Sequence, residues 1–600
     1  MHLIPSNKYF NLLELNEILI SDKNMSEATK LFDDFWNWRL KQSPEFASMT
    51  GCRDFNDKLE SFTVDRFEND YKNCLDFITK ARALQVLEPE EKLNLEFFIA
   101  ELSTFTDGYH LKGYFFPINY MEGVHIDFQR LSEWTSPKTN KDYEDLIARY
   151  KKFSIYAKQI IDIMKIGIKE KLTNHLISMK GVVDQCKEHA TKNPQETVFY
   201  QPFAKMEENN IMDSNVVKRL QSSAVEAIKK SIQIGFLEIA DFLENEYKAA
   251  CRQNIAATSL TGIGPEFYKV CLRFHTSTEF TAQEIHDMGL KEVERIEGEM
   301  KEIIKEMGLQ LSLKEFIEKL RNDKRNFFNS EQELLDAFHT IIFDQINPQL
   351  PTFFHKCPKS KLEITKAPMA DYPAAYYIAG TEDGSRPGKL FVNTFKFDSQ
   401  PRYEMISLAL HESYPGHHLQ FSYMLETEGI PQFRKVMEDR VYSQAPSRFP
   451  TNTAYVEGWG LYSETLGHDL GLYKDPMDRY GHLSEEIFRA CRLVVDTGMH
   501  ALGWSTEEAV QYMTEHSAAS KENIVGEVNR YVTWPGQAVG YKVGQMKIIQ
   551  LRKKAEKALG DKFDIKDFHA VVLKSAGPLY ILEKQVDLWI SNAMQSCLLQ

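Results

Sequence analysis

Residues 411–418 read His411-Glu412-Ser413-Tyr414-Pro415-Gly416-His417-His418, which places three histidines and a carboxylate within eight positions. The preceding run 405–410, Met-Ile-Ser-Leu-Ala-Leu, is apolar, so the pattern predicts that His-Glu lies on a buried helix. Zinc takes neutral imidazole nitrogens as ligands, and a carboxylate beside the first ligand can accept a proton from metal-bound water. The stretch is therefore typical of the metal-binding helix of a zinc hydrolase.

Helix geometry alone leaves the second histidine ligand open between His417 and His418. On an unbroken α-helix, positions i and i+7 share a face, which would pair His411 with His418. Pro415 lacks an N–H, its ring clashes with the carbonyl of His411, and Gly416 adds backbone freedom. We therefore expect a kink or bulge that could turn His417 onto the face of His411.

A second helix is predicted to begin near Thr453 and to supply the third ligand. Glu457 and Glu464 lie seven positions apart, so both project from one face of this helix. Gly458 and Gly460 lower helix stability and make sense where another group must approach the backbone closely. A carboxylate from a second helix commonly completes a zinc site, so Glu457 is the candidate. The alternative is that both acids lie on a solvated face.

A charged stripe is predicted on a buried helix further along the chain. Arg489, Arg492, Asp496 and His500 share one helical face, and their neighbours are apolar. Because lone buried charges are costly, these groups should pair with one another. They could orient metal ligands from behind, or they could form a structural ion-pair ladder, which the pattern slightly favours.

The last informative stretch surrounds Tyr541. Gly540 and Gly544 would let their helix press closely against a neighbour. Tyr541 is a candidate donor to the oxyanion of a tetrahedral intermediate, and Arg530 could hold a substrate carboxylate through two hydrogen bonds. The alternative is that both are structural. The candidates for substrate contact or for support of the ligands are then His418, Glu464, Arg492, Asp496, His500 and Arg530.

Composition excludes several classes of protein. Hydrophobic residues at 43% and charged residues at 26% are typical of a globular protein, and the net charge of −14 with no basic stripe disfavours nucleic acid as a partner. No window reaches the ~18 apolar residues of a membrane span. Acidic residues interrupt the N-terminal stretch where a signal peptide needs an apolar core, and eight dispersed cysteines suit reduced thiols. We therefore predict a cytoplasmic protein.

The predicted fold is mainly α, a large multi-helix fold with a small sheet beside the metal helix. Residues 1–257 read as an N-terminal helical region and 258–600 as a C-terminal metal-binding region, although one continuous architecture also fits. Residues 374–378 and 389–393 read as two strands around a Gly/Pro-rich connection. Their free edge could hold an extended peptide, or the pair could be a structural hairpin.

Four motifs resemble, in order, the domain of unknown function 885 family. They are His-Glu-x-x-Pro-Gly-His-His-Leu-Gln (411–420), Glu-Gly-Trp-x-Leu-Tyr-x-Glu (457–464), Arg-Leu-Val-Val-Asp-Thr-Gly-x-His (492–500) and Pro-Gly-Gln-Ala-x-x-Tyr-Lys-x-Gly (535–544). The resemblance covers most of residues 258–600. It implies a helical fold similar to the gluzincin type of zinc peptidase, with His411, His417 and Glu457 as ligands and Glu412 as the general base.

The hypothesis from the sequence is a hydrolase with one zinc ion that cleaves amide bonds, most simply in small peptides. One alternative is a non-haem iron enzyme, which uses the same two-histidine, one-carboxylate ligands. Another is a helical binding protein whose metal is structural. Glu412 argues against both, because neither needs a base beside its first ligand. The exact substrate and the oligomeric state, a homodimer included, stay open.

Overall fold

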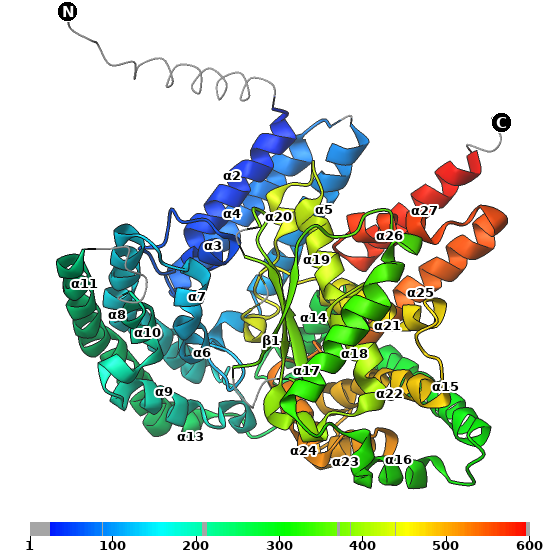
Figure 1. Ribbon diagram of the computed structural model, residues 1–600. Helices are drawn as coiled ribbons and strands as arrows, with labels where there is room; N and C mark the ends of the chain where they lie inside the picture. Colours follow the sequence, from blue (N-terminus) through cyan, green and yellow to red (C-terminus); the bar gives the residue numbers. More distant parts are fainter. Residues whose placement is uncertain are drawn as a thin grey trace, which may run out of the picture.

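The computed structural model describes residues 25–86, 88–206, 213–368, 373–384, 386–438 and 440–595. Helices dominate, and one small sheet lies among them, which confirms the predicted mainly helical class (Figure 1). A capping box begins α15 (Ala282–Glu306), in which the side chains of Thr281 and Glu284 each bond the other's backbone N–H.

The first helices form a layer held together by aromatic side chains. Phe35 and Phe98 lie edge to face with centroids 5.1 Å apart, and Phe433 of the later helix α20 joins them at 5.3 Å from Phe98. Figure 1 shows these blue helices beside α20 (Gln432–Lys435). The helices of this group are α2 (Glu27–Gln42), α3 (Pro44–Thr50), α4 (Val64–Ala83) and α5 (Pro89–Tyr109).

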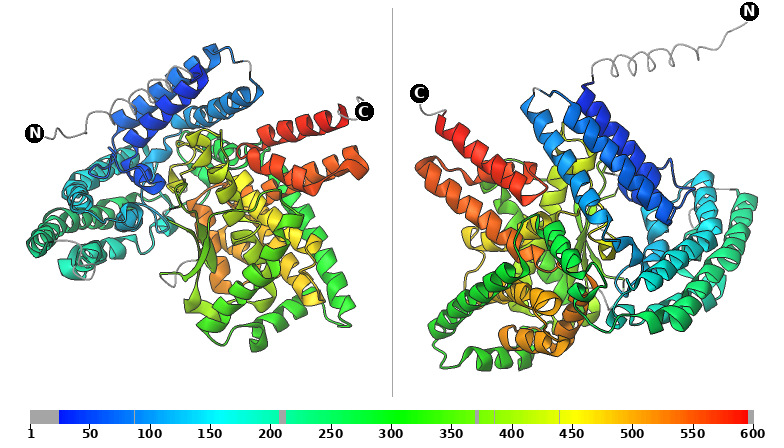
Figure 2. Two further views of the ribbon diagram at one scale, coloured as in Figure 1. Left: turned by 45° about the horizontal axis from the view of Figure 1, so that its top comes forward. Right: turned by 180° about the vertical axis from the view of Figure 1, so that it is seen from behind.

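A curved arm of helices follows, drawn in cyan and teal at one side of the molecule (Figures 1 and 2). The helix α8 is the longest of them. Residues 214–250 form one run in which two π-helical turns, Ile228–Ile232 and Leu243–Tyr247, separate three α segments. The helices are α6 (Val124–Asp127), α7 (Leu131–Thr135), α8 (Asn140–Glu170), α9 (Val182–Thr191), α10 (Gln201–Ala204), α11 (Ser214–Ala227), α12 (Gln233–Phe242) and α13 (Lys248–Ala250).

The remaining helices follow in the second half of the chain and include α18, α19 and α21, which carry the predicted metal ligands. α15 packs along α22, and α21 packs along α25. Besides α15 the helices are α14 (Gly264–Thr276), α16 (Leu313–Asn322), α17 (Glu331–His339), α18 (Met405–Glu412), α19 (His417–Glu426), α20 (Gln432–Lys435), α21 (Thr453–Asp469), α22 (Pro476–Ala501), α23 (Thr506–His516), α24 (Lys521–Thr533), α25 (Gly540–Leu559), α26 (Ile565–Lys574) and α27 (Leu579–Gln595).

The sheet has three strands in the order β1-β3-β2. The two predicted strands are β2 (Ala375–Ile378) and β3 (Gly388–Val392), which pair antiparallel with Ala375 opposite Val392. The third strand, β1 (Leu362–Lys366), pairs parallel to β3 and was not predicted from the sequence. Its residues Leu-Glu-Ile-Thr-Lys alternate apolar and polar side chains, but only two apolar residues carry the pattern in so short a strand.

Buried contacts join the two halves of the chain. One apolar core contains Phe62 from the first half and Ile590 from the second. The carboxylate of Glu122 accepts hydrogen bonds from the backbone N–H of Tyr442 at 2.7 Å and from the indole of Trp534 at 3.1 Å. The segment that leads into α21 is therefore anchored to the first half. The predicted division at 257/258 stays a prediction.

Candidate metal centre

His411, His417 and Glu457 meet in a buried group whose candidate ligand atoms all lie within 4.8 Å of one another. The Nε2 atoms of His411 and His417 lie 3.5 and 3.4 Å from Oε2 of Glu457. Ligand atoms about 2.1 Å from a tetrahedral zinc ion would be about 3.4 Å apart. The two imidazoles and the carboxylate therefore have the chemistry and the spacing to hold such an ion.

A break in the helix brings His417 to this group. α18 ends at Glu412 and α19 begins at His417, which confirms the predicted interruption at Pro415-Gly416. A Cβ on Gly416 would lie 1.8 Å from the carbonyl oxygen of His411, so only glycine permits this close turn. The imidazoles of His411 and His417 stand nearly perpendicular, with centroids 4.8 Å apart.

Glycines let α21 approach from the other side, as the sequence predicted. A Cβ on Gly460 would lie 2.7 Å from Nε2 of His411. The indole of Trp459 donates a hydrogen bond of 2.9 Å to the carbonyl of Pro415, which ties α21 to the break between α18 and α19. Glu457 is thereby held against both histidines.

Side chains behind the group orient the two imidazoles. Nδ1 of His411 lies 2.8 Å from Oε1 of the buried Glu464, which leaves Nε2 directed at the centre. Nδ1 of His417 lies 3.3 Å from Oε1 of Gln420. Gln420 was not among the predicted site residues, although its position three residues after His417 on a helix could have indicated the contact.

The electrostatics of the group favour a bound cation. Burial lowers the pKa of His411, but hydrogen bonds with Glu457 and Glu464 outweigh it and raise that pKa to about 10. Burial raises the pKa of Glu457, but His411 and His417 hold it well below its usual value. A metal ion would replace the protons that these side chains otherwise share.

Glu412 lies beside the group without belonging to it. Burial raises its pKa, and the imidazoles of His411 and His417 act against that rise. The residue is partly exposed, whereas its neighbour His411 is buried. Its carboxylate is therefore close to the ligands, and solvent can reach part of the residue.

His418 lies outside the group and connects α19 to the sheet. Its Nε2 lies 3.2 Å from the carbonyl of Ser360 and must donate, so Nδ1 accepts from the hydroxyl of Tyr377 at 3.0 Å. Burial lowers the pKa of His418 to about 4. The structure therefore places His417, rather than His418, with His411 and Glu457.

Asp496 and His500 lie deep in α22 and connect backbone segments. Asp496 accepts from the hydroxyl of Tyr268 at 2.7 Å and from the N–H of Gly536 at 3.1 Å. His500 accepts from the N–H of Ala257 at 3.0 Å through Nδ1. These contacts are structural, but the expected pairing within the stripe is wrong among the described residues, because Arg489 pairs with Glu485 and Arg492 with Glu527 instead.

Tyr541, Arg492 and Arg530 lie together on the α25 side of the centre. Arg530 donates a hydrogen bond of 3.0 Å to the hydroxyl of Tyr541, and the guanidinium of Arg492 lies 4.5 Å from the Tyr541 ring. Burial raises the pKa of Tyr541, and the carboxylate of Glu457 adds to the rise. Tyr541 is thus a neighbour of the third candidate ligand.

The seam between α21 and α25 fixes this neighbourhood. A Cβ on Gly458 would lie 2.5 Å from Cα of Gly544, and a Cβ on Gly540 would lie 2.9 Å from the Thr453 side chain. The two helices therefore run in the same direction with their backbones in contact, which is the close approach predicted from Gly540 and Gly544.

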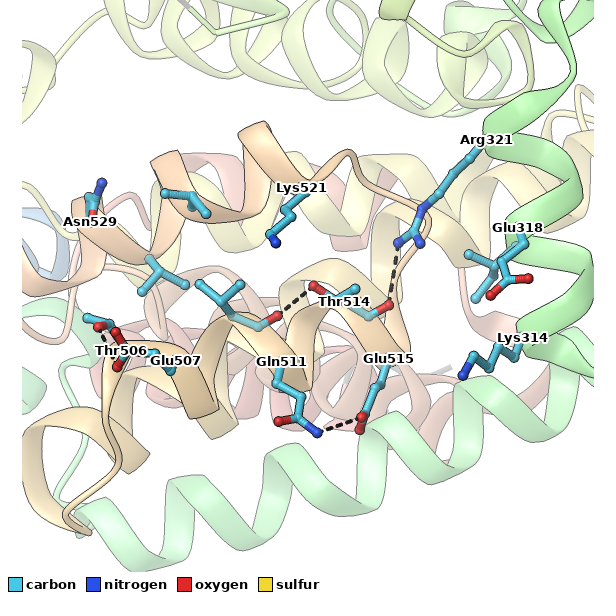
Figure 3. Close-up of a pocket in the computed structure, with 14 residues that line it drawn as sticks. Lys314, Glu318, Arg321, Thr506, Glu507, Gln511, Thr514, Glu515, Lys521 and Asn529 are labelled. Atoms are coloured by element: carbon cyan, nitrogen blue, oxygen red, sulfur yellow. Dashed lines mark hydrogen bonds between the residues drawn. The ribbon is translucent and has the colours of Figure 1, made fainter.

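A cavity of about 660 Å³ lies elsewhere, between α16, α23 and α24. Figure 3 shows Arg321 turned toward Thr514, whose carbonyl accepts from it at 3.4 Å. None of the metal-centre residues lines this cavity. Among the residues that the structure describes, no helix combines the length and apolar character that a bilayer crossing requires.

Fold and site together define a mainly helical protein with a buried His-His-Glu group that could hold a metal. The chain belongs to the family described as bacterial protein of unknown function (DUF885), whose model matches residues 44–586, so the resemblance is confirmed. No curated protein matches the chain significantly.

Solved structures share the fold along nearly the whole chain. A candidate lipoprotein from Colwellia psychrerythraea is similar with a TM-score of 0.87 and 26% identity, over 94% of this chain and 99% of that one. A candidate lipoprotein of unknown function from Shewanella oneidensis is similar with a TM-score of 0.69 and 15% identity, over 93% and 99% of the two chains. The second likeness concerns the fold alone.

Proposed function

We propose that this protein is a zinc-dependent hydrolase that cleaves amide bonds in small peptides. The observation that carries the proposal is the convergence of His411, His417 and Glu457 next to Glu412. The group supplies three protein ligands from the described residues, which fits a catalytic zinc site better than a closed structural site with four. A zinc ion held there would polarise a carbonyl oxygen and lower the pKa of a water molecule.

The chain's own residues would carry the proton transfers. Glu412 would accept a proton from the attacking water and pass it to the leaving amine as the C–N bond breaks. Tyr541 accepts a hydrogen bond from Arg530, so its own O–H proton is available for the carbonyl oxygen as negative charge develops there. Glu464 and Gln420 would hold the two imidazoles in place.

Digestion of a mixed peptide library tests the proposal, with products identified by mass. Zinc-loaded protein should cleave peptides, chelation should stop cleavage, and added zinc should restore it. Glu412→Gln should lower kcat by about 10²- to 10⁴-fold while zinc content stays unchanged, because it removes the base and leaves the ligands. Full turnover by this variant would remove Glu412 from its role. Iron in protein purified without added metal, with oxygen-dependent turnover, would favour the iron alternative.

Location is a separate proposal. We place the protein in the cytoplasm because its described cysteines are free and mostly buried, as reduced thiols are. The similar structure from Colwellia psychrerythraea is described as a candidate lipoprotein, which favours the cell envelope as the alternative location. Cell fractionation followed by immunodetection distinguishes these locations, and signal in the membrane fraction would overturn the cytoplasmic proposal.

A further inference from the structure

Two buried arginines share one carboxylate beside the metal centre. Arg489 pairs with Glu485, which leaves Arg492 and Arg530 to share the single carboxylate of Glu527. Their guanidinium nitrogens lie 2.7 and 3.2 Å from its two oxygens. Burial raises the pKa of Glu527, but Arg530 and Arg492 lower it to about 2. Two cations therefore face one anion in a site where charge is costly.

Hydrogen bonds do not use all the donors of these two arginines. Nη1 of Arg492 is buried, and no described residue accepts from it. Nε of Arg530 is likewise buried without an acceptor, while its Nη2 donates to Gln537 and Tyr541. Unpaired N–H groups of a buried guanidinium are unfavourable, so this part of the site has donors for one more anionic acceptor.

The donors lie next to the residues proposed to act on the amide. The Tyr541 hydroxyl is 3.0 Å from Nη2 of Arg530, and Tyr541 also neighbours Glu457. These residues are partly accessible to solvent, since the side chains of Arg530, Glu527 and Glu457 are 16%, 17% and 18% exposed. A ligand could therefore contact the metal centre and the arginines together.

We infer that Arg492 and Arg530 bind a carboxylate of the substrate one residue beyond the cleaved amide, so that the protein releases the C-terminal residue of a peptide. The inference rests on the proposed function. Because the Tyr541 hydroxyl and Nη2 of Arg530 lie 3.0 Å apart, a carbonyl oxygen at Tyr541 and a carboxylate at Arg530 must belong to neighbouring groups of the substrate, and one extended residue spans about 3.3–3.6 Å. Hydrolysis adds OH to the acyl carbon and H to the departing nitrogen, so the released product is a free amino acid. A free N-terminal ammonium would be repelled by this cationic pair.

Binding to metal-free protein tests the inference without any turnover. Isothermal calorimetry would compare acetyl-leucine, acetyl-leucinamide and acetyl-aspartic acid α-amide. Acetyl-leucine should bind at least about tenfold more tightly than the amide, because charge-assisted hydrogen bonds to the carboxylate are lost. Equal binding of acid and amide would overturn the inference. Tighter binding of the aspartate compound would overturn the C-terminal assignment, since a side-chain carboxylate would then be the ligand.

Variants of Arg530 extend the test. Arg530→Met should remove the preference for acetyl-leucine, and Arg530→Lys should retain part of it, because lysine keeps the charge but loses the planar fork. A preference that survives in Arg530→Met, with the thermal transition intact, would overturn the inference. Arg479→Met is the matched control on α22, where Arg479 pairs with the exposed Glu306, and it should change nothing.

Kinetics with zinc-loaded protein separate the two proposals. Acetyl-Phe-Leu should be cleaved with a kcat/KM at least about tenfold above that of its C-terminal amide, and Arg530→Met should lose this ratio mainly through KM. If neither peptide is cleaved while metal-free protein still prefers acetyl-leucine, the proposed hydrolase function fails. If both are cleaved equally, the hydrolase stands and the C-terminal assignment fails.

Discussion

Nδ1 of His411 lies 2.8 Å from Oε1 of Glu464, and both side chains are almost completely buried although 53 positions separate them. The contact joins the helix that carries the first candidate ligand to the helix that carries the third. Glu464 fixes which nitrogen of His411 bears the proton, so Nε2 is left for a metal.

Glu464→Gln should weaken zinc binding by about 10- to 100-fold, because the neutral amide orients His411 less firmly and makes it a poorer ligand. Competition with a chromogenic chelator measures the affinity. Glu556→Gln is the control, since Glu556 pairs with Arg552 on α25. Equal zinc affinity in wild type and Glu464→Gln would contradict the orienting role.

Gly460→Ala should push His411 from its place, because the new methyl group would lie 2.7 Å from Nε2. Overpacking of this size costs about 1–3 kcal/mol, which corresponds to about 10- to 100-fold if it falls on zinc affinity. Gly298→Ala is the matched change, since nothing lies within 4 Å of its Cβ, and it should stabilise α15 by about 0.5–1 kcal/mol. Zinc titration measures the affinity of each variant, and thermal unfolding measures its stability. Unchanged zinc affinity in Gly460→Ala would be inconsistent with the close contact.

His417→Ala and His418→Ala should have different effects on zinc content and on stability. The first removes a candidate ligand, so zinc content after dialysis should fall to background. The second removes one hydrogen-bond partner each from the hydroxyl of Tyr377 and the carbonyl of Ser360, so it should lower stability by about 1–3 kcal/mol while one zinc per chain remains. Loss of zinc from His418→Ala alone would reverse the assignment of the second ligand.

His500 should make stability depend on pH in a defined direction. Burial lowers its pKa to about 3, against about 6.5 in the unfolded chain. Between these values the unfolded chain binds a proton that the fold excludes, so the stability from His500 is complete above pH 6.5 and declines as pH falls. The decline is about 1.4 kcal/mol per pH unit.

The thermal transitions of wild type and His500→Gln therefore should lie furthest apart at pH 7.5 and converge toward pH 4. Circular dichroism at several pH values measures the difference between the two transition temperatures. This difference isolates His500, because the other groups titrate in both proteins. A gap that stays constant across this range would show that His500 is not the neutral buried group inferred from its contact with Ala257.

Much of the site could be predicted from the sequence because its residues are local or have distinctive backbone needs. Pro415-Gly416 indicated the break that the structure shows, and the glycines at 458 and 460 indicated a close approach. Helix periodicity could not choose between His417 and His418, since that choice depends on how far the chain turns after Glu412. The family resemblance supplied it.

Contacts between residues far apart in the chain could not be predicted from the sequence. Nothing near His418 indicates that Tyr377 and Ser360 will accompany it, because those partners lie 41 and 58 positions away. The edge strand β1 was not predicted, because it becomes a strand by pairing with β3 more than through the propensity of its own residues. Asp496 could be recognised as a buried charge, but Tyr268 and Gly536 could not be recognised as the groups it holds.

The contact of Gly458 with Gly544 leaves no side chain between the two helix backbones. Such a backbone contact is rigid, because there is no side chain that could change its conformation. Heating or ligand entry should move Glu457 and Tyr541 as one body, so their mutual spacing should persist while surrounding parts rearrange. Motions that admit and release ligands must then occur on another side of the site, because the α21–α25 contact holds this side rigid.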